Sequence, residues 1–209
     1  MIYDISPPLA EGLAVWPGDT PLRREVLLDM KRGENITLST LHGTVHLGAH
    51  ADSPSHYAAD GQTIDQRRLD YYLGPCQVMR APAERGTRIT AGMLSKPITA
   101  PRVLFQTGTF PDPNQFNNDF AALSPDLVES LHQRGVILIG IDTPSVDLFE
   151  SKDLPAHQIF LRHDMAILEG LVLDGVPEGT YELIALPLKI VGFDASPVRA
   201  VLRETNREF

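Results

Sequence analysis

The sequence predicts a mixed α+β or α/β sandwich, and three observations lead to this fold class. Segments with the alternation and residue types of strands outnumber helical segments. The two kinds of element follow one another in mixed order rather than in strict alternation. Of the 209 residues, 43% are hydrophobic and 22% are charged, which is typical of a globular chain with a sizeable core. We therefore expect a single domain over residues 1–209, without a doubly wound parallel sheet.

The predicted strands are short and are separated by turn residues. Residues 1–6 alternate like a strand that ends at Pro7-Pro8, and Trp16 opens a turn rich in Pro and Gly over 16–21. The remaining predicted strands are apolar or alternating runs bounded by such residues, at 25–28, 36–41, 76–80, 103–107, 136–141, 181–186 and 198–202.

The clearest predicted helix begins after Ser124, a favourable N-cap, with Pro125 at its first position. An apolar stripe follows, and Gly135 ends the helix. Shorter helical stretches are predicted at 156–162, 64–73 and 90–94.

Composition excludes several classes of partner. The net charge of −9, without a prominent basic cluster, argues against nucleic acid and anionic membranes. The first residues have neither the basic nor the apolar region of a signal peptide, and no apolar run approaches the ~20 residues that span a bilayer. The single cysteine, Cys76, cannot form an internal disulfide and is interpreted as a small buried hydrophobe. We expect a cytoplasmic protein that acts on a small molecule.

The most informative segment lies between residues 43 and 56, where four possible metal ligands occupy even positions. They are His46, His50, Asp52 and His56. A strand over 45–51 would point its even-numbered side chains to one face, and a turn at 53–54 would bring the last histidine back towards them. Imidazoles with a carboxylate suit zinc, and also manganese or cobalt.

A helix offers an alternative, because His46 and His50 have the i, i+4 spacing of a helical zinc motif. Gly48 and Pro54 disfavour it, and Leu47 stands where that motif requires Glu. The strand is therefore the better prediction. His56 keeps two open roles, as a further ligand or as an unligated acid/base.

Elsewhere in the chain, single residues allow both a functional and a structural interpretation. His157 and Glu169 could bind a metal, or could be a core histidine and a paired or capping carboxylate. Asp142 follows a buried strand and is either a site residue or the start of an Asx-turn. Trp16 either anchors its loop or offers a flat wall to an aromatic substrate. The roles of His42 and His163 stay open.

Several catalytic motifs are missing from the sequence. There is no glycine-rich loop for a dinucleotide or a nucleoside triphosphate, and no Gly-x-Ser-x-Gly nucleophile elbow. Any catalysis is therefore expected to depend on the imidazoles.

The segment His46-Leu47-Gly48-Ala49-His50-Ala51-Asp52-Ser53-Pro54-Ser55-His56 resembles the signature of the cyclase-type metal-dependent hydrolases. Within that superfamily the chain resembles the bacterial kynurenine formamidases, or arylformamidases, over essentially its whole length. This closer resemblance also rests on Trp16-Pro17-Gly18-Asp19 and on His157 followed twelve residues later by Glu169-Gly170-Leu171. Many superfamily members have Thr at position 49, and Ala49 agrees with the formamidase branch.

The resemblance implies a compact β/β/α sandwich and a site for two divalent ions per subunit, with zinc as the first expectation. One ion would be held by His46, His50 and Asp52. Asp52 would bridge to the second ion, which His157 and Glu169 would also hold.

The activity implied by the resemblance is hydrolysis of N-formyl-L-kynurenine to L-kynurenine and formate, in tryptophan degradation, by a metal-activated water. His56 would be the catalytic acid/base, Trp16 would line the substrate pocket, and the chain would assemble as a homodimer or higher. Two alternatives stay open. One is another amide or lactam hydrolase of the superfamily, such as an isatin hydrolase, and the other is a zinc-binding protein without turnover.

Overall fold

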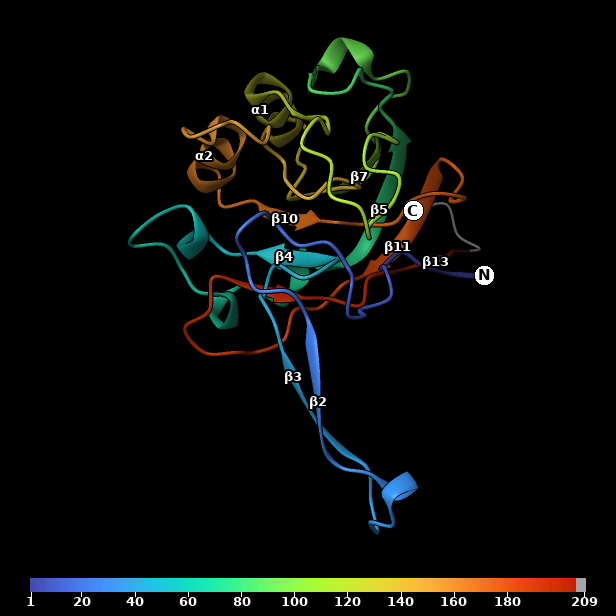
Figure 1. Ribbon diagram of the computed structural model, residues 1–209. Helices are drawn as coiled ribbons and strands as arrows, with labels where there is room; N and C mark the ends of the chain where they lie inside the picture. Colours follow the sequence, from blue (N-terminus) through green and yellow to red (C-terminus); the bar gives the residue numbers. More distant parts are fainter. Residues whose placement is uncertain (206–209) are drawn as a thin grey trace.

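The computed structural model describes residues 1–205, and its main feature is a curled, nine-stranded mixed sheet (Figure 1). In order across the sheet the strands are β1 (Ile2–Asp4), β13 (Val201–Glu204), β11 (Gly179–Ile184), β5 (Leu73–Arg80), β7 (Arg102–Gln106), β9 (Leu138–Ile141), β10 (Ala166–Glu169), β4 (His50–Asp52) and β12 (Ala195–Pro197). Strands β5, β7, β9 and β10 are parallel to one another, and the outer strands pair antiparallel. The predicted mixed fold class is confirmed.

Two α-helices, α1 (Pro125–Gln133) and α2 (Pro155–Arg162), lie side by side over one face of the sheet (Figure 1). Helix α1 begins as predicted, because the Ser124 side chain accepts a hydrogen bond from the backbone N–H of Leu127 at 3.1 Å. It ends before Gly135, which adopts a positive φ of 84°. Within residues 1–205, five short 3₁₀ helices complete the helical elements: Met30–Arg32, Pro54–His56, Ile64–Gln66, Leu69–Tyr71 and Ala91–Met93.

The two faces of the sheet bury separate apolar cores, as the period of two along a strand requires. Phe105 and Ile167 point towards the helices, where they pack with the apolar stripe of α1. Their neighbours Leu104 and Leu168 point to the opposite face. There the curl of the sheet brings them against Leu202 and other side chains of β11 and β13. Position in the sheet therefore fixes which side chains reach the helix-covered face.

The predicted strand over 45–51 is wrong in its extent. Strand β4 comprises His50–Asp52 only, and the chain before it is irregular. Gly48 has a φ of +59°, a left-handed conformation that no strand can continue through. His46 consequently reaches the other polar side chains from a loop, whereas the predicted turn at Pro54 is present as a 3₁₀ helix.

Other elements differ in extent or were not predicted. The apolar run that ends at Glu169 forms a strand, β10, although it had no strand prediction. Residues 64–73 contain two separate 3₁₀ turns and the start of β5, because Arg67 and Arg68 have extended conformations. The predicted strand at 198–202 lies later, in β13, and two residue pairs, β6 (Arg88–Ile89) and β8 (Ala122–Leu123), form a small parallel ladder.

A two-stranded ribbon leaves the body of the molecule and projects into solvent (Figure 1). It consists of β2 (Arg23–Leu28) and β3 (Leu38–His42), which pair antiparallel with a register shift between Val26 and Leu28. Within residues 1–205, these two strands pair with no other strand. We refer to residues 23–42 as the arm.

Neither α-helix in the described part of the chain has the length and apolar character that a membrane crossing requires.

Candidate metal centre

The pairing of β4 with β10 places three ionisable side chains on one face of the sheet. In this antiparallel pair His50 lies opposite Glu169, and Asp52 lies opposite Ile167. Directly opposed residues point to the same side of a sheet, and so do residues two apart along a strand. Ile167 faces the helices, and His50, Asp52 and Glu169 therefore face them too. All three are nearly fully buried.

Helix α2 supplies a further imidazole from above this face. His157 lies in the first turn of α2 and is 2% exposed. The residue before the helix, Leu154, provides no capping side chain. Asp147 takes that role, because its carboxylate accepts the N–H groups of Ala156 and His157 at 3.1–3.2 Å. The same carboxylate thus fixes the start of the helix and the position of the imidazole.

The loops on both sides of β4 add two more imidazoles. His46 precedes the strand and His56 follows it, and their ring centroids lie 4.2 Å apart. A single carboxylate, Asp194, contacts both rings, at 2.9 Å from His46 Nε2 and 3.4 Å from His56 Nδ1. Asp194 is held in turn by Ser53, whose backbone N–H and hydroxyl both donate to its carbonyl oxygen.

Gly170 allows the first of these loops to approach Glu169. It has a φ of +64°, and a Cβ at this position would lie 2.2 Å from the carbonyl oxygen of Gly48. Only a residue without a side chain permits this contact. The Gly48 carbonyl can therefore accept a hydrogen bond from His50 Nδ1 at 2.9 Å, which orients that ring.

Three imidazoles share one arrangement, in which an oxygen outside the cluster holds one ring nitrogen. These outer contacts, each 2.9 Å long, join His50 Nδ1 to the Gly48 carbonyl, His157 Nδ1 to Asp147 and His46 Nε2 to Asp194. A hydrogen bond of this kind fixes the tautomer of a metal-binding histidine and directs the other nitrogen to the ion.

The opposite ring nitrogens converge on two buried carboxylates. His46 Nδ1 lies 3.1 Å from Asp52, and His50 Nε2 lies 3.3 Å from Glu169 and 3.4 Å from Asp52. His157 Nε2 lies 3.6 Å from Asp52 and 3.7 Å from Glu169. The predicted ligand residues His46, His50, Asp52, His157 and Glu169 are thus brought into one cluster.

The donor atoms at the centre of this cluster fit a cation. Both carboxylate oxygens of Asp52 and the Nε2 atoms of His50 and His157 are buried without a hydrogen-bond partner. Buried polar atoms in this state are costly unless something binds them. Nitrogen and carboxylate oxygen donors together suit zinc and similar divalent ions.

Two compact ligand groups overlap at Asp52, which belongs to both. One contains His46, Asp52 and His56, and the other contains His50, Asp52 and Glu169. This division differs from the one that the sequence resemblance implies, because His50 lies with Glu169 and His56 lies with His46. His56 therefore keeps both of its predicted roles, as a ligand or as an acid/base.

The electrostatics of the cluster show that protons and a metal would compete for the same atoms. Burial disfavours a charged ring, but contacts with Asp52 and Asp194 outweigh it and raise the pKa of His46 to about 9. Burial is likewise outweighed at His157, where Asp147 and Asp52 raise the pKa to about 10. Burial alone would raise the pKa of Asp52, but hydrogen bonds with His157 and His46 hold that pKa well below its ordinary value.

The cluster lies at the base of a cavity of about 770 Å³. One wall is aromatic and contains Trp16, Phe110 and Phe116, with Trp16 and Phe116 in an edge-to-face contact at 5.6 Å. Trp16 also packs against Phe149 at 5.0 Å, so the structure gives it both the loop-anchoring contact and the position on the wall that the sequence left as alternatives.

The other residues singled out from the sequence lie outside this cluster. Asp142 borders the cavity, but its carboxylate accepts the N–H groups of Thr107 and Gly108 and so organises the loop after β7. His42 pairs with Glu25 on the arm at 2.9 Å. His163 stacks on the ring of His132, with the two ring centroids 3.9 Å apart. Cys76 is fully buried, and burial raises the pKa of its thiol.

Two residues of the centre were missed from the sequence, Asp147 and Asp194. Asp147 is separated from His157 by ten residues, and Asp194 from His46 by 148. Asp147 gave no local signal, because it lies eight positions before Pro155, where α2 begins. Nothing local distinguishes Asp194, because only the folding of β12 beside β4 brings it to the histidines.

Comparison with known proteins places these observations in a family. Residues 3–148 match the family model described as "Putative cyclase". The chain is similar to a solved structure described as a potential metal-dependent hydrolase with cyclase activity, with 28% identity and a TM-score of 0.85 over 98% of this chain and 99% of that one. It is also similar to a predicted metal-dependent hydrolase from Bacillus stearothermophilus, with 29% identity and a TM-score of 0.80 over 97% of each chain.

The fold is shared with isatin hydrolase A from Labrenzia aggregata. The two chains are 22% identical and superpose with a TM-score of 0.83 over 97% of this chain and 93% of the other. At this level of identity the likeness concerns the fold.

Proposed function

This chain belongs to the putative cyclase family, and from that premise we propose that it is a metal-dependent amide hydrolase whose substrate is N-formyl-L-kynurenine. The observation that carries the proposal is the set of three imidazoles, each held from outside and directed at two buried carboxylates. Two relatives above 25% identity, described as a potential and a predicted metal-dependent hydrolase, support the class of reaction. The sequence resemblance to the formamidases supports the substrate.

In this proposal His46, His50, Asp52, His157 and Glu169 would hold two zinc ions, and Asp52 would contribute to both sites. The overlap of two ligand groups at Asp52 supports this number. When bound, divalent ions lower the pKa of water towards neutrality and polarise a carbonyl oxygen. The outer contacts of Asp147 and Asp194 keep the ligand rings in place without reorganisation.

His56 is the proposed proton donor of the reaction. Water adds to the formyl carbon, the C–N bond breaks, and the departing arylamine nitrogen takes up a proton, which gives formate and L-kynurenine. His56 borders the cavity with a side chain that is 36% exposed, and its Nδ1 faces Asp194. Its Nε2 makes no hydrogen bond within residues 1–205, so it is free to deliver a proton to the leaving nitrogen.

The cavity suits an aryl formamide with an ammonium group. The aromatic wall around Trp16 offers edge and face contacts to the aryl ring. Asp19 and Asp174 border the same cavity and supply negative charge for the α-ammonium group.

One feature of the lining favours a second candidate. Within residues 1–205 the cavity lining contains no Lys or Arg that could pair with the α-carboxylate of N-formyl-L-kynurenine. A neutral lactam such as isatin requires no such partner. Hydrolysis of isatin, or of a related lactam, is therefore the alternative function of the same centre.

A comparison of three substrates tests the proposal. Zinc-loaded protein would be given N-formyl-L-kynurenine, formanilide, which lacks the amino-acid end, and isatin. We expect kcat/KM to be largest for N-formyl-L-kynurenine, and we expect Asp174→Asn to raise KM for this substrate while leaving KM for formanilide unchanged. Faster hydrolysis of isatin would replace the proposed substrate by the alternative, and hydrolysis of none would contradict both.

A further inference from the structure

The cavity above the metal centre contains a polar side chain that the proposed mechanism does not use. Gln106 is the last residue of β7 and borders the cavity. The Oε1 atom of its amide is buried and has no hydrogen-bond partner. Its Nε2 atom makes no hydrogen bond within residues 1–205 either. A buried carbonyl oxygen in this state is costly unless something binds it, so Gln106 is a candidate contact for the substrate.

The sheet places Gln106 away from the metal ligands but on the same cavity. Glu169 is the last residue of β10, and β9 lies between β10 and β7. Two spacings between neighbouring strands therefore separate the two positions by about 10 Å. Gly108, Asp142 and Gly170, which follow these strands, also border the cavity. A substrate held at the metal centre can thus extend over the carboxyl ends of the parallel strands to Gln106, and ligands of such sheets commonly bind there.

Hydrogen bonds on both sides hold the backbone at Gln106. Its carbonyl oxygen accepts the N–H of Ala81 at 2.9 Å. The N–H groups of Thr107 and Gly108 donate to the carboxylate of Asp142 at 2.8 and 2.9 Å. A side chain on such a backbone can bind a ligand at little further cost in backbone entropy.

Gln106 is also the best donor that the lining offers to an anion. Within residues 1–205 and outside the metal centre, only three side chains of the lining carry an N–H or O–H group: Trp16, Gln106 and Ser145. Trp16 belongs to the aromatic wall, and the Ser145 hydroxyl already accepts the N–H of Asp147. The amide of Gln106 offers two N–H donors.

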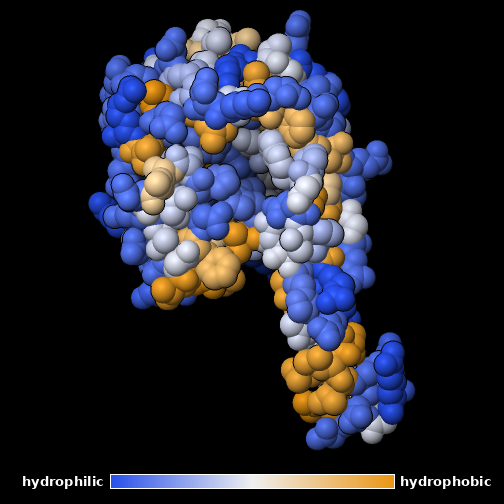
Figure 2. All heavy atoms as spheres, turned by 60° about the vertical axis from the view of Figure 1, so that its left-hand side comes forward, coloured by the Kyte–Doolittle hydropathy of each residue, from blue (hydrophilic) through white to orange (hydrophobic). Residues whose placement is uncertain are grey.

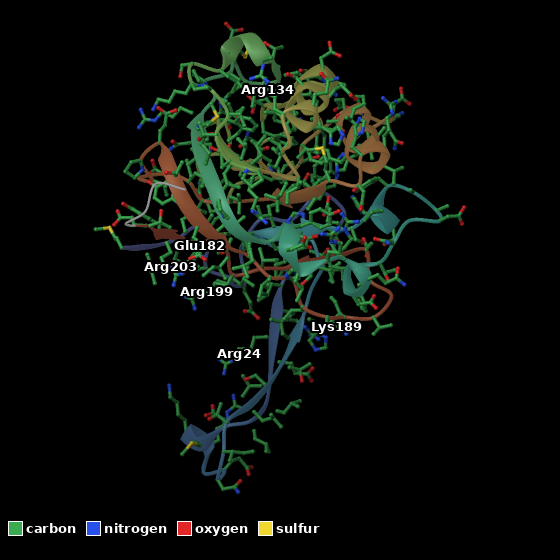
Figure 3. The ribbon with its side chains drawn as sticks, turned by 180° about the vertical axis from the view of Figure 1, so that it is seen from behind. Arg24, Arg134, Glu182, Lys189, Arg199 and Arg203 are labelled. Atoms are coloured by element: carbon green, nitrogen blue, oxygen red, sulfur yellow. The ribbon has the colours of Figure 1, made fainter. Side chains whose placement is uncertain are left out.

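Basic side chains of the body lie on its outer surface instead. That surface is mostly hydrophilic (Figure 2). Lys189, Arg199 and Arg203 are exposed on it (Figure 3), and none of them borders the cavity. A carboxylate that enters the cavity therefore depends on neutral donors.

We propose that Gln106 determines substrate specificity by donating a hydrogen bond from Nε2 to a carboxylate of the substrate. The inference rests on the proposed function, in which that group is the α-carboxylate of N-formyl-L-kynurenine, and it narrows the substrates to aryl formamides that carry a carboxylate. Rotation about the last torsion of the side chain can turn either amide atom to the ligand. The same amide then offers Oε1 to the α-ammonium group, which gives this oxygen the partner that it lacks.

A comparison of two substrates tests this role. N-formylkynuramine keeps the aryl formamide and the ammonium group of N-formyl-L-kynurenine but lacks the carboxylate. With zinc-loaded protein we expect kcat/KM to favour the carboxylate substrate about tenfold, because a hydrogen bond to a charged group contributes on this scale. Gln106→Leu should abolish the preference, mainly through KM. Gln106→Glu has the same shape but a negative charge and should reverse it. The control Gln133→Leu, at an exposed position of α1, should retain it.

The ratio of the two kcat/KM values separates a role in specificity from a role in folding, since general damage to the site lowers both values alike. An unchanged ratio in Gln106→Leu, with hydrolysis of both formamides intact, would overturn the role of Gln106 and leave the proposed function standing. A wild-type chain without preference for the carboxylate substrate would overturn that role as well.

Binding of the two products separates the role of Gln106 from the proposed reaction. Calorimetric titration of L-kynurenine and of kynuramine into zinc-loaded protein requires no turnover. We expect L-kynurenine to bind about tenfold more tightly, and we expect the difference to disappear in Gln106→Leu. This result in a chain that hydrolyses neither formamide would support Gln106 as the carboxylate contact while contradicting the proposed function. Equal binding of the two products by the wild type would overturn the role of Gln106.

Discussion

The metal centre and the arm depart from ordinary burial in opposite directions. At the centre, His50, Asp52 and His157 are almost fully buried with polar atoms that lack partners. On the arm, Leu27 and Leu41 are apolar and exposed. Only four positions separate the end of β3 at His42 from His46 in the cluster. Buried polar groups and exposed apolar patches are the informative exceptions in a folded protein, and each indicates something that binds there.

The comparison teaches that one chain can contain two incomplete surfaces of different chemistry. The centre suits a cation, because its atoms are nitrogen and carboxylate oxygen donors that lie close together in two overlapping groups. The arm presents apolar surface, which offers no ligand to a metal. The following changes should therefore separate the two regions.

The largest effect is expected from Asp52→Ala. Asp52 belongs to both ligand groups, so its loss should remove bound metal and lower kcat/KM by about 10³-fold or more. Metal analysis and hydrolysis of N-formyl-L-kynurenine would be measured together, with the exposed Asp60→Asn as the matched control. A variant that retained two metals would refute the shared role of Asp52.

His56→Ala should lower turnover without removing the metal. A general acid contributes about 10²- to 10⁴-fold, and we expect a loss of kcat in this range with the metal content unchanged. The comparison of kcat with metal content distinguishes the two roles of His56. Loss of metal in this variant would make His56 a ligand, and normal turnover would exclude it as the acid.

Metal affinity should increase with pH below about pH 9. The raised pKa values of His46 and His157 mean that both imidazole rings are positively charged at neutral pH in the metal-free protein. A metal must therefore displace the extra proton from each ring. Asp52 has a lowered pKa and adds no such competition. Affinity should therefore fall by up to about tenfold per displaced proton for each unit of decreasing pH. Calorimetric titration of zinc at pH 6, 7 and 8 would measure this, and an affinity independent of pH would be inconsistent with these protonation states.

Asp194→Asn should have a smaller effect on the same centre. It keeps the size of the side chain but weakens the contacts with His46 and His56, and changes of this kind cost about 10- to 100-fold in metal affinity or activity. The exposed Asp60→Asn is again a suitable control. If zinc affinity and kcat both stay at wild-type values, Asp194 does not position these rings.

The smallest effect is expected on the arm. Leu27→Ser should change the free energy of unfolding by less than about 0.5 kcal/mol, because the residue is 52% exposed and lies outside the buried core. The buried Leu168→Ala should cost about 2–5 kcal/mol. Urea denaturation at several protein concentrations would compare them. A cost for Leu27→Ser as large as that for Leu168→Ala would break the distinction between arm and core.

Sequence reasoning located the histidine-rich segment but misjudged its backbone. The alternation of His46, His50 and Asp52 suggested one continuous strand, whereas the left-handed Gly48 ends it before His46. The side chains still converge, because the approach of Gly48 to Gly170 brings the loop over β10. A short strand next to a loop cannot be distinguished from a longer strand by residue period alone.

The missing parts of the prediction depend on contacts between distant segments. Strand β10 does not alternate apolar and polar residues, because both of its faces are buried. Its apolar run therefore did not distinguish a strand from a helix. Asp147 and Asp194 act through the packing of α2 and β12, which local sequence does not specify. The strands of the arm were predicted approximately, at 25–28 and 36–41. The projection of these strands into solvent was not predicted, because apolar residues in a strand ordinarily face the core of their own chain.

The most direct test of the central claim is removal and return of the metal. Purified protein would be stripped with a chelator, and hydrolysis of N-formyl-L-kynurenine would be followed by the absorbance of the freed arylamine as zinc is added back. We predict that stripping abolishes activity and that zinc restores it, with saturation close to two ions per chain. Activity that survived complete removal of metal from a folded chain would contradict the account.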